Sequence, residues 1–391
     1  MACVLTPEGQ ETRTFGTMTA ERLTLADWLL ARGCTHVAIE STGDSWKPVF
    51  NSLEGTGEVV LVKAQHVQTA PGRQTDVNDA AWLAALLQHG FLRASFIPPV
   101  AQRELRDLTR YRRTCIRERV TLINRVQKLL EDATIKLAAV ASAIMGGSGR
   151  AILAALLTGH TGPQALAELA KGRLRSKRER LARALEGRGK PHRRFVLSEL
   201  FCPIDSLDDT IARFDAQIQA ICGAFAEAVG LLDTIPGVAH RTAELIGAEI
   251  GIATERFPRA DHLASWAGVA PGNYERAGKR TPGKTRKGDR CLRTALVHAA
   301  PAAAPTEHTY LSAQYRRLAS RRGKKRAIWA VAHSILVRAY DLIQRRAPYR
   351  EAGADFFDRL QPADTARRLV KRIESLGYQV TLQSPSTDAL P

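Results

Sequence analysis

Residues 35–43 read THVAIESTG, an apolar run that ends at the acidic residue Glu40 and a polar turn signal. An apolar run of this length, bounded by turn residues, predicts a buried β-strand. In open α/β sheets, binding sites lie at the carboxyl ends of the strands. We therefore expect Glu40 to emerge at the carboxyl edge of a sheet.

Two further acidic residues lie at the expected start of a helix, in the stretch 75–83, TDVNDAAWL. Asp76 and Asp79 are three positions apart, which places both carboxylates on one helix face, where they could share a hard divalent cation with Glu40. Alternatively, Asp76 caps the helix and Asp79 complements its dipole. The three residues together favour the first interpretation, a site for Mg²⁺ or Mn²⁺ that is also the catalytic site.

The composition is that of a folded protein. The chain has 391 residues, 45% of them hydrophobic and 25% charged, enough for roughly two or three domains. No apolar run approaches the about 20 residues that span a bilayer, and the N-terminus does not resemble a signal peptide. The six cysteines are scattered. This argues against a zinc module or a disulfide framework and fits a reducing cytoplasm.

The net charge of +18 is unevenly distributed. Residues 1–80 hold six Lys or Arg and ten Asp or Glu, a net charge of −4, whereas the remaining residues carry +22. A basic region of this size would bind a polyanion through its phosphates. The acidic segment would hold the cation.

The expected elements of the first hundred residues follow the order ββαβαβα. Strands are expected at 2–5, 12–15, 35–40 and 58–62, and helices at 20–32, 46–53 and from 76 onward. This order resembles the latter part of a ribonuclease-H-like fold, whose first strand carries an Asp. We therefore expect that first strand, and its Asp, to be missing from this chain.

A long helix is expected from about residue 102 to residue 137. Apolar side chains recur every seven positions in this segment, at Leu108, Cys115, Leu122 and Leu129. The repeat could form a coiled coil that joins subunits, or an amphipathic helix that packs on the core. Arg112 and Arg119 interrupt the repeat, and both alternatives stay open.

Residues 231–243, LLDTIPGVAHRTA, predict two helices joined by a tight turn at Pro236 and Gly237. The pattern resembles a helix-hairpin-helix, in which backbone N–H groups of the turn meet a phosphate. Ala239 replaces the second glycine of that pattern, so a plain helix–turn–helix connection is the alternative. In the first interpretation Gly237 binds nucleic acid.

The densest basic stretch is 276–293, where glycines separate the charges and predict a loop or hairpin. Its basic residues are Arg276, Lys279, Arg280, Lys284, Arg286, Lys287, Arg290 and Arg293. A second cluster spans residues 316–326, before a helix expected at 327–342. Two dense basic clusters favour nucleic-acid binding over a merely solvated surface.

Several of these stretches together resemble one family along nearly the whole chain. They are AIESTG at 38–43, PGRQTDVNDA at 71–80, IPGV at 235–238, LASWAGVAPGN at 263–273 and GKTRKGD at 283–289. The family is the DEDD-type insertion-sequence transposases, relatives of the Piv DNA invertase. Its members have a RuvC-like N-terminal domain, a coiled-coil connector and a C-terminal transposase domain.

The resemblance implies a mechanism in which RuvC-like carboxylates bind Mg²⁺ and a serine of the C-terminal domain becomes linked to DNA. Glu40, Asp76 and Asp79 match the second, third and fourth acids of the family. The position of the family serine is occupied here by Arg276 and Ala277. Ser265 and Thr281 are the nearest hydroxyls, and Ser265, which we expect to pack on a helix, is a weak substitute candidate.

We therefore expect an α/β RuvC-like domain at 1–100 that lacks its first strand, followed by a mainly helical region. That region would comprise a coiled-coil connector at 101–228, a transposase domain with a helix-hairpin-helix-like start at 229–350, and an extension at 351–391. The implied partners are DNA, a structured guide RNA as in some members, and further copies of the chain, in a bacterial cytoplasm near the nucleoid and away from membranes.

The expected function is DNA transposition by Mg²⁺-assisted strand cleavage and exchange. Because the first acid and the family serine are missing, we expect this chemistry to be impaired in the chain as given. Two alternatives remain: a metal-dependent nuclease that cuts DNA junctions, which needs no serine, and a transposase remnant that binds nucleic acid without cutting it.

Overall fold

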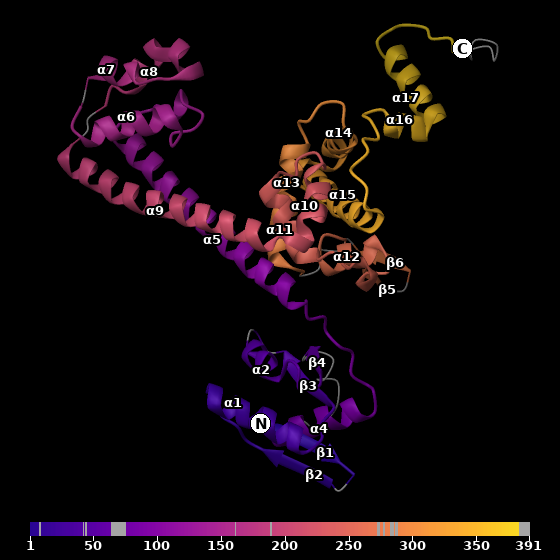
Figure 1. Ribbon diagram of the computed structural model, residues 1–391. Coiled ribbons are helices and arrows are strands. Elements are labelled where there is room, and N and C mark those ends of the chain that lie inside the picture. Colours follow the sequence, from indigo (N-terminus) through magenta and orange to yellow (C-terminus); the bar gives the residue numbers. More distant parts are fainter. Residues whose placement is uncertain are drawn as a thin grey trace. The chain divides into compact units, whose positions relative to one another are not determined.

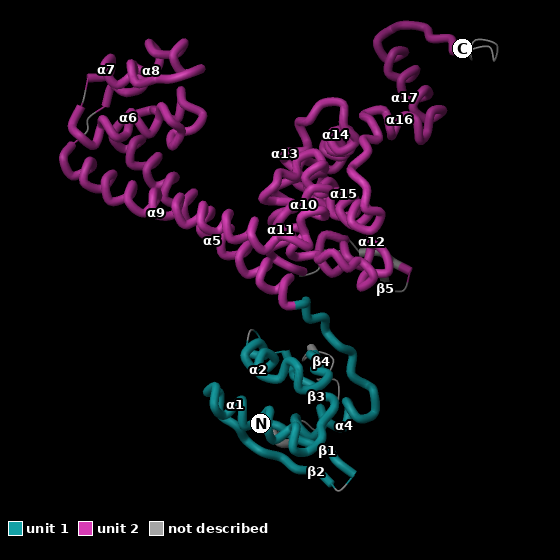
Figure 2. The backbone as a smooth tube through the Cα atoms, in the orientation of Figure 1, with its two compact units in different colours: residues 1–99 teal, residues 100–391 magenta. Residues whose placement is uncertain are grey.

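The computed structural model describes residues 1–7, 9–41, 43, 45–63, 76–160, 162–187, 190–271, 274–276, 278–281, 285 and 288–382. The chain divides into two compact units, residues 1–99 and residues 100–391 (Figure 2). Helices dominate, and the sheets are small (Figure 1). In the described part of the chain, no helix is both long and apolar enough to cross a bilayer. The finer division expected from the sequence stays a prediction.

Unit 1 contains four described strands and three described helices, in the expected order. They are β1 (Ala2–Thr6), β2 (Gly9–Arg13), α1 (Thr19–Ala31), β3 (His36–Ser41), α2 (Trp46–Leu53), β4 (Glu58–Lys63) and α4 (Asp76–Gln88). β1 and β2 pair antiparallel, with Ala2 opposite Arg13, and β3 and β4 pair parallel, with His36 opposite Glu58. Among the described strands, these pairs form two separate sheets.

Two small groups of apolar side chains hold unit 1 together. Val4 of β1 packs with Trp28 and Leu29 of α1 in one group, and Val60 and Val62 of β4 are buried in the other. β4 is thus the buried strand that its sequence predicts. The expectation of a buried strand at 35–40 is wrong in degree, because His36 is exposed and the rest of β3 is only partly buried.

Unit 2 begins with a long pair of helices and a small helical cap. Its first helices are α5 (Val100–Asp132), α6 (Gly147–Leu157), α7 (Pro163–Glu168), α8 (Arg178–Ala184) and α9 (Pro191–Ile221), with 3-10 turns at Leu137–Ala139 and Gly172–Lys177. α5 and α9 lie side by side (Figure 1). The four residues of the apolar repeat are only partly buried, whereas the buried residues of α5 are Gln102, Leu105, Thr109, Arg112, Val126 and Leu130.

The two arginines that interrupt the repeat face acidic partners instead of solvent. The Arg112 guanidinium is almost fully buried and lies 2.8 Å from Asp215 Oδ1 on α9 and 2.6 Å from Glu244 Oε2. Arg119 pairs with Asp208 of α9. Since these charges are matched across the helix pair, the arginines fit a contact surface that apolar periodicity alone would not assign to them.

The remainder of unit 2 is a helical body. Its elements are the 3-10 turn Gly223–Phe225, α10 (Ala226–Asp233), α11 (His240–Ile250), the 3-10 turn Thr254–Arg256, α12 (Ala260–Trp266), β5 (Tyr274–Arg276), β6 (Lys279–Thr281), α13 (Arg290–Ala303), α14 (Tyr310–Arg322), α15 (Lys324–Arg345), α16 (Phe356–Leu360) and α17 (Pro362–Glu374). A single large apolar core joins α10, α11, α13 and α15. The helix expected at 327–342 begins earlier, at Lys324, directly after Gly323.

The turn at Pro236 and Gly237 connects α10 to α11 and packs against α13. Gly237 has φ +84°, and a Cβ atom there would lie 2.5 Å from Ala303 N and 2.7 Å from Ala299 O. The glycine is therefore required by a close approach of backbones. Packing explains this residue without a phosphate, and its binding of nucleic acid stays a prediction.

Replacing Gly237 with Ala should lower the free energy of unfolding by about 2–4 kcal/mol, because both the positive φ and the contact with α13 oppose a Cβ atom. Gly230→Ala in α10 is the matched control: its Cβ would meet nothing within 4 Å, so the change should stabilise by about 0.5–1 kcal/mol. Urea denaturation of both variants measures the difference. Equal effects would show that the turn does not pack as described.

Candidate functional site

A cavity of about 1120 Å³ lies in unit 1 and brings together two of the predicted metal ligands. It is lined by β1 and β3, with α1 and α4 contributing further side chains. Glu40 is the second-last residue of β3, and Asp79 lies in the first turn of α4. Both residues line the cavity. Asp76 begins α4, but its side chain lies outside the described part of the chain.

Local structure explains these positions. Glu40 pairs with Val62 near the end of the parallel pair, and the chain then leaves the strand through Gly43 at φ +55°. The carboxylate therefore sits close to the carboxyl edge, where the sequence placed it. Asp79 lies one turn into α4, where a negative charge is also favoured by the helix dipole. The dipole interpretation of this residue consequently stays open.

Among the described strands, β1 pairs with β2 alone and β3 pairs with β4 alone, and both β1 and β3 line the cavity.

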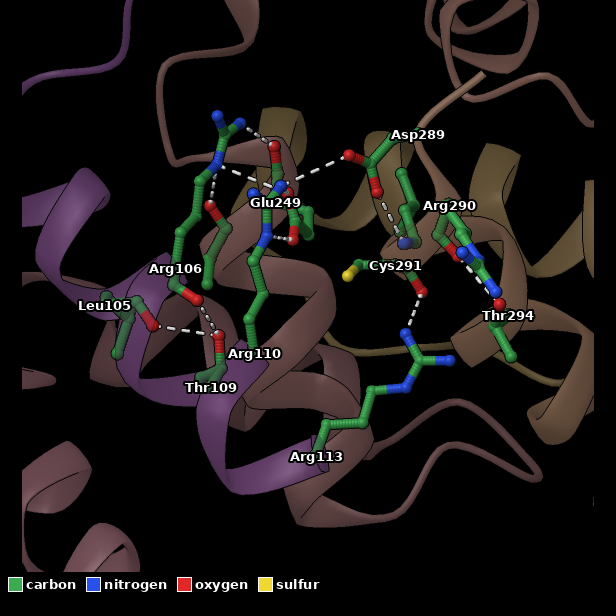
Figure 3. A network of polar contacts seen from close by, with 12 residues as sticks. Leu105, Arg106, Thr109, Arg110, Arg113, Glu249, Asp289, Arg290, Cys291 and Thr294 are labelled. Atoms are coloured by element: carbon green, nitrogen blue, oxygen red, sulfur yellow. Dashed lines mark hydrogen bonds and ion pairs between the residues drawn. The ribbon is translucent and has the colours of Figure 1, made fainter. Parts of the chain in front are cut away.

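A second acidic group occurs in unit 2, where Glu249, Asp289 and Cys291 hold ligand atoms within 4.8 Å of one another. It is the one such group of three among the described residues. Two arginines of α5 reach the same place (Figure 3). Arg110 donates from Nε to Glu249 Oε1 at 2.7 Å and from Nη2 to Glu249 Oε2 at 2.8 Å. The guanidinium already holds the carboxylate by two bonds, so this group is a buried ion-pair network.

The electrostatics of the network follow from burial. The side chain of Glu249 is fully buried, and this burial raises the pKa of its carboxyl, against the attraction of Arg110 and Arg106. Burial likewise lowers the pKa of Arg106. The hydrogen bond to Glu249 raises the pKa of Arg110, which therefore stays charged.

The same network fixes the end of the basic stretch. Arg110 Nη2 lies 3.2 Å from Asp289 Oδ2, and Asp289 Oδ1 accepts a 2.7 Å hydrogen bond from Leu292 N, capping α13. Arg113 donates to the carbonyl oxygen of Cys291 at 3.0 Å. α5 thus holds the first turn of α13, the helix that follows the basic stretch.

The sequence reasoning missed Arg106, Arg110 and Glu249. A usable signal was present, because Glu249 lies in AELIGAEIG, a run of small and apolar residues at 243–251. A carboxylate in such a run requires a cationic partner once the helix is buried. The partner could not be named from sequence, since it lies 139 residues away.

The basic stretch is a hairpin followed by a helix. β5 and β6 pair antiparallel, and Gly278, at φ +74°, lies in the turn between them. This hairpin confirms, for residues 274–281, the expectation that the basic stretch forms a loop or hairpin. The extension of the loop to residue 293 is wrong: Arg290 and Arg293 lie on α13 because Asp289 caps that helix. Arg293 stands over the Trp329 ring, 5.2 Å from its centroid.

Six other basic positions have no described side chain. Arg276, Lys279 and Arg280 lie on the hairpin strands, whereas three lie outside the described residues altogether, namely Lys284, Arg286 and Lys287. Their contact with nucleic acid remains a prediction.

The hydroxyl candidates are placed on two elements. Ser265 lies on a helix, as expected, namely α12, and its side chain is exposed; its role as a substitute nucleophile stays a prediction. Thr281 is the last residue of β6. At the family serine position, Arg276 ends β5 and Ala277 is outside the described residues.

A cavity that is lined by Glu40 and Asp79 in an α/β unit, together with a helical unit whose basic stretch contains a hairpin, fits the class of proteins that process nucleic acid. Residues 1–135 match the model of the DEDD-type IS110 family, described as "Transposase", and residues 229–317 match "Transposase IS116/IS110/IS902 family". The chain belongs to this family of DEDD-type insertion-sequence transposases. Membership points to dependence on a divalent metal.

Two bacterial relatives are similar over most of the chain. The transposase for insertion sequence element IS1111A of Coxiella burnetii is 24% identical over 326 residues, which cover 81% of this chain and 79% of the relative. A probable family 20 transposase of Pseudomonas aeruginosa is 27% identical over 271 residues, covering 68% of this chain and 70% of the relative.

Removing the carboxylate of Glu249 should destabilise unit 2 strongly. Glu249→Ala leaves two arginines without their buried partner, so the free energy of unfolding should fall by about 3–5 kcal/mol. Asp261→Ala is the control, because its 3.2 Å pair with Arg259 is exposed and such pairs contribute less than about 1 kcal/mol. Guanidinium denaturation compares them. Similar small losses would mean that the network does not hold α5 in place.

Proposed function

We propose that this chain acts on DNA as an insertion-sequence transposase and that its metal centre is the cavity of unit 1. The observation that supports this most directly is that Glu40 and Asp79, from two different elements, line the same cavity. That cavity lies within the region that matches the DEDD-type transposases. Two of the three acids carried over from the family thus line the same cavity, which supports the proposal.

The donor set suits a hard divalent cation. Glu40, Asp79 and Asp76 supply only carboxylate oxygens, which are the ligands that Mg²⁺ and Mn²⁺ prefer. These three residues would hold the ion. When bound, it would neutralise the negative charge that develops on a phosphate during strand cleavage. The residues of the chain orient the ion and hold the DNA backbone near it.

The first acid of the family, the one that Glu40, Asp76 and Asp79 do not match, is proposed to lie on a strand beside β1 or β3. A carboxylate on that strand would join Glu40 and Asp79 along the cavity.

Strand exchange needs a nucleophile as well as a metal. An arginine cannot attack a phosphate, so Arg276 does not replace the family serine. Ser265 is exposed on α12, yet a nucleophile must be placed within about 3–3.5 Å of the reacting atom. We infer that the chain binds DNA but forms no covalent link to it.

Two alternatives to the transposase function are also proposed. The carboxylates without a serine favour a nuclease that cuts branched DNA, and this predicts Mg²⁺-dependent cleavage of four-way junctions. The absence of the family serine, with Arg276 and Ala277 in its place, is also compatible with a binding remnant that competes with active relatives, and this predicts tight binding without cleavage. A structured guide RNA and assembly into oligomers are further proposals, tested by RNA binding and by light scattering.

The metal site can be tested by calorimetry. Glu40→Ala and Asp79→Ala should each abolish the binding of Mn²⁺, because ligand charge sets the affinity for hard cations. Glu58→Ala is the matched control, since this carboxylate on β4 is exposed and does not line the cavity. Unchanged affinity in the first two variants, with their helix content intact, would place the ion elsewhere.

Binding of duplex DNA tests the basic stretch. Replacing Lys284, Arg286 and Lys287 by Ala should weaken binding on all sequences and flatten the slope of log affinity against log salt by roughly two to three units. A matched triple replacement in the exposed 3-10 turn Gly172–Lys177, of Arg173, Arg175 and Lys177, should leave the slope unchanged. If both triples act equally, binding follows total charge and not the stretch.

A further inference from the structure

A second concave surface lies far along the chain, at α14, α16 and α17. We call it the arginine hollow. It has a volume of about 590 Å³ and is lined by Arg316, Arg317, Arg321, Phe357, Asp358 and Arg368, among others. Three of the arginines come from α14 and the fourth from α17. Helices α14 and α17, which are separate in sequence, thus both contribute positive charge to the hollow.

The charges in the hollow are not balanced. Arg368 pairs with Asp358 at 3.4 Å, and Arg317 stands 5.3 Å from the centroid of the Phe357 ring. Within the described part of the chain, the one ion pair of the hollow is that of Arg368, and Arg316 and Arg321 have no carboxylate partner. Four guanidinium groups against one carboxylate produce a positive potential, which a concave surface strengthens. The hollow therefore favours an anion.

The walls of the hollow are held by the core of unit 2. Leu311 and Ser312 of α14 are buried, whereas Arg316 and Arg321 of the same helix are exposed. On the other wall, the Phe357 ring stacks on Tyr310, with centroids 5.2 Å apart. The stacked rings fix α16 against α14. The Phe357 ring consequently forms an ordered aromatic part of the lining, beside the guanidinium groups.

The size and the chemistry of the hollow select the ligand. Its volume lies within the about 300–1,000 Å³ typical of sites for small ligands. Guanidinium groups bind phosphate oxygens by paired hydrogen bonds, and the planes of arginines and aromatic rings accept unpaired bases. A duplex presents a convex backbone that does not enter such a hollow, whereas an unpaired nucleotide does.

We propose that the arginine hollow binds a nucleotide of single-stranded nucleic acid, with Arg316 and Arg321 on its phosphates. The proposal rests on the proposed function, since it assumes that the chain handles DNA or RNA strands. It adds a separate site for unpaired strands to the duplex-binding stretch. DNA and RNA share the phosphodiester, so both are used as probes.

The test uses the full chain and labelled single strands of DNA and RNA with matched sequence. The double variant Arg316→Gln, Arg321→Gln should bind them at least about tenfold more weakly in moderate salt and flatten the salt slope by about 1.4 units, at roughly 0.7 per phosphate contact. Its binding of duplex DNA should change little. A larger loss on RNA than on DNA would assign the hollow to RNA, and the reverse to DNA.

Two further variants separate binding from a general loss of charge. The control Arg359→Gln, Arg367→Gln removes two exposed arginines that pair with Asp355 and Asp364 outside the hollow, and should leave single-strand binding unchanged. Asp358→Asn removes the one carboxylate of the hollow and should tighten binding. If the arginines of α14 are only a solvated surface, Asp358→Asn should leave single-strand binding unchanged.

The outcomes distinguish the two proposals. Equal loss on single strands and duplex in the hollow variant, or an equal effect of the control, overturns the arginine hollow and leaves the proposed function in place. If wild-type protein binds neither duplex nor single strands, the proposed function fails as well. Thermal unfolding of each variant verifies that the helices around the hollow are retained.

Discussion

A fully buried carboxylate, Glu249, organises unit 2. It is held by Arg110 through two hydrogen bonds and approached by Arg106, and Arg110 continues to Asp289. Breaking such a buried pair leaves an uncompensated charge, so the three elements involved must keep their mutual positions. The start of α5, the end of α11 and the cap of α13 are thereby fixed together. The end of the basic stretch is set by the same contacts.

The backbone of α11 is part of this arrangement. Gln102 and Arg106 both donate to the carbonyl oxygen of Ala248, at 2.9 Å each. These bonds supply partners for the Ala248 carbonyl oxygen. It lies near the end of α11, where carbonyl groups lack partners within the helix. α5 therefore caps α11 with side chains as well as binding Glu249. A helix that the sequence presented as a connector is, in its first turns, an integral part of the helical body.

Much of the candidate site could be read from particular residues. The apolar run before Glu40 gave a strand, and the i, i+3 spacing of Asp76 and Asp79 gave a helix start, because both signals are local. That Glu40 and Asp79 line one cavity was an inference from the order of elements. The sequence misjudged β3, which is only partly buried, since the exposure of a strand depends on whether a neighbour covers it.

By itself the sequence determined the element order of unit 1, the acidic residues and the position of the basic hairpin, because short-range periodicity and turn residues set these features. Only the tertiary structure decided that Arg112 is buried against Asp215 and Glu244 and that Gly237 packs on α13. It also decided that arginines of α14 and α17 face one hollow. Each of these depends on contacts between residues far apart in the chain, and apolar periodicity carries no information about which charges will meet.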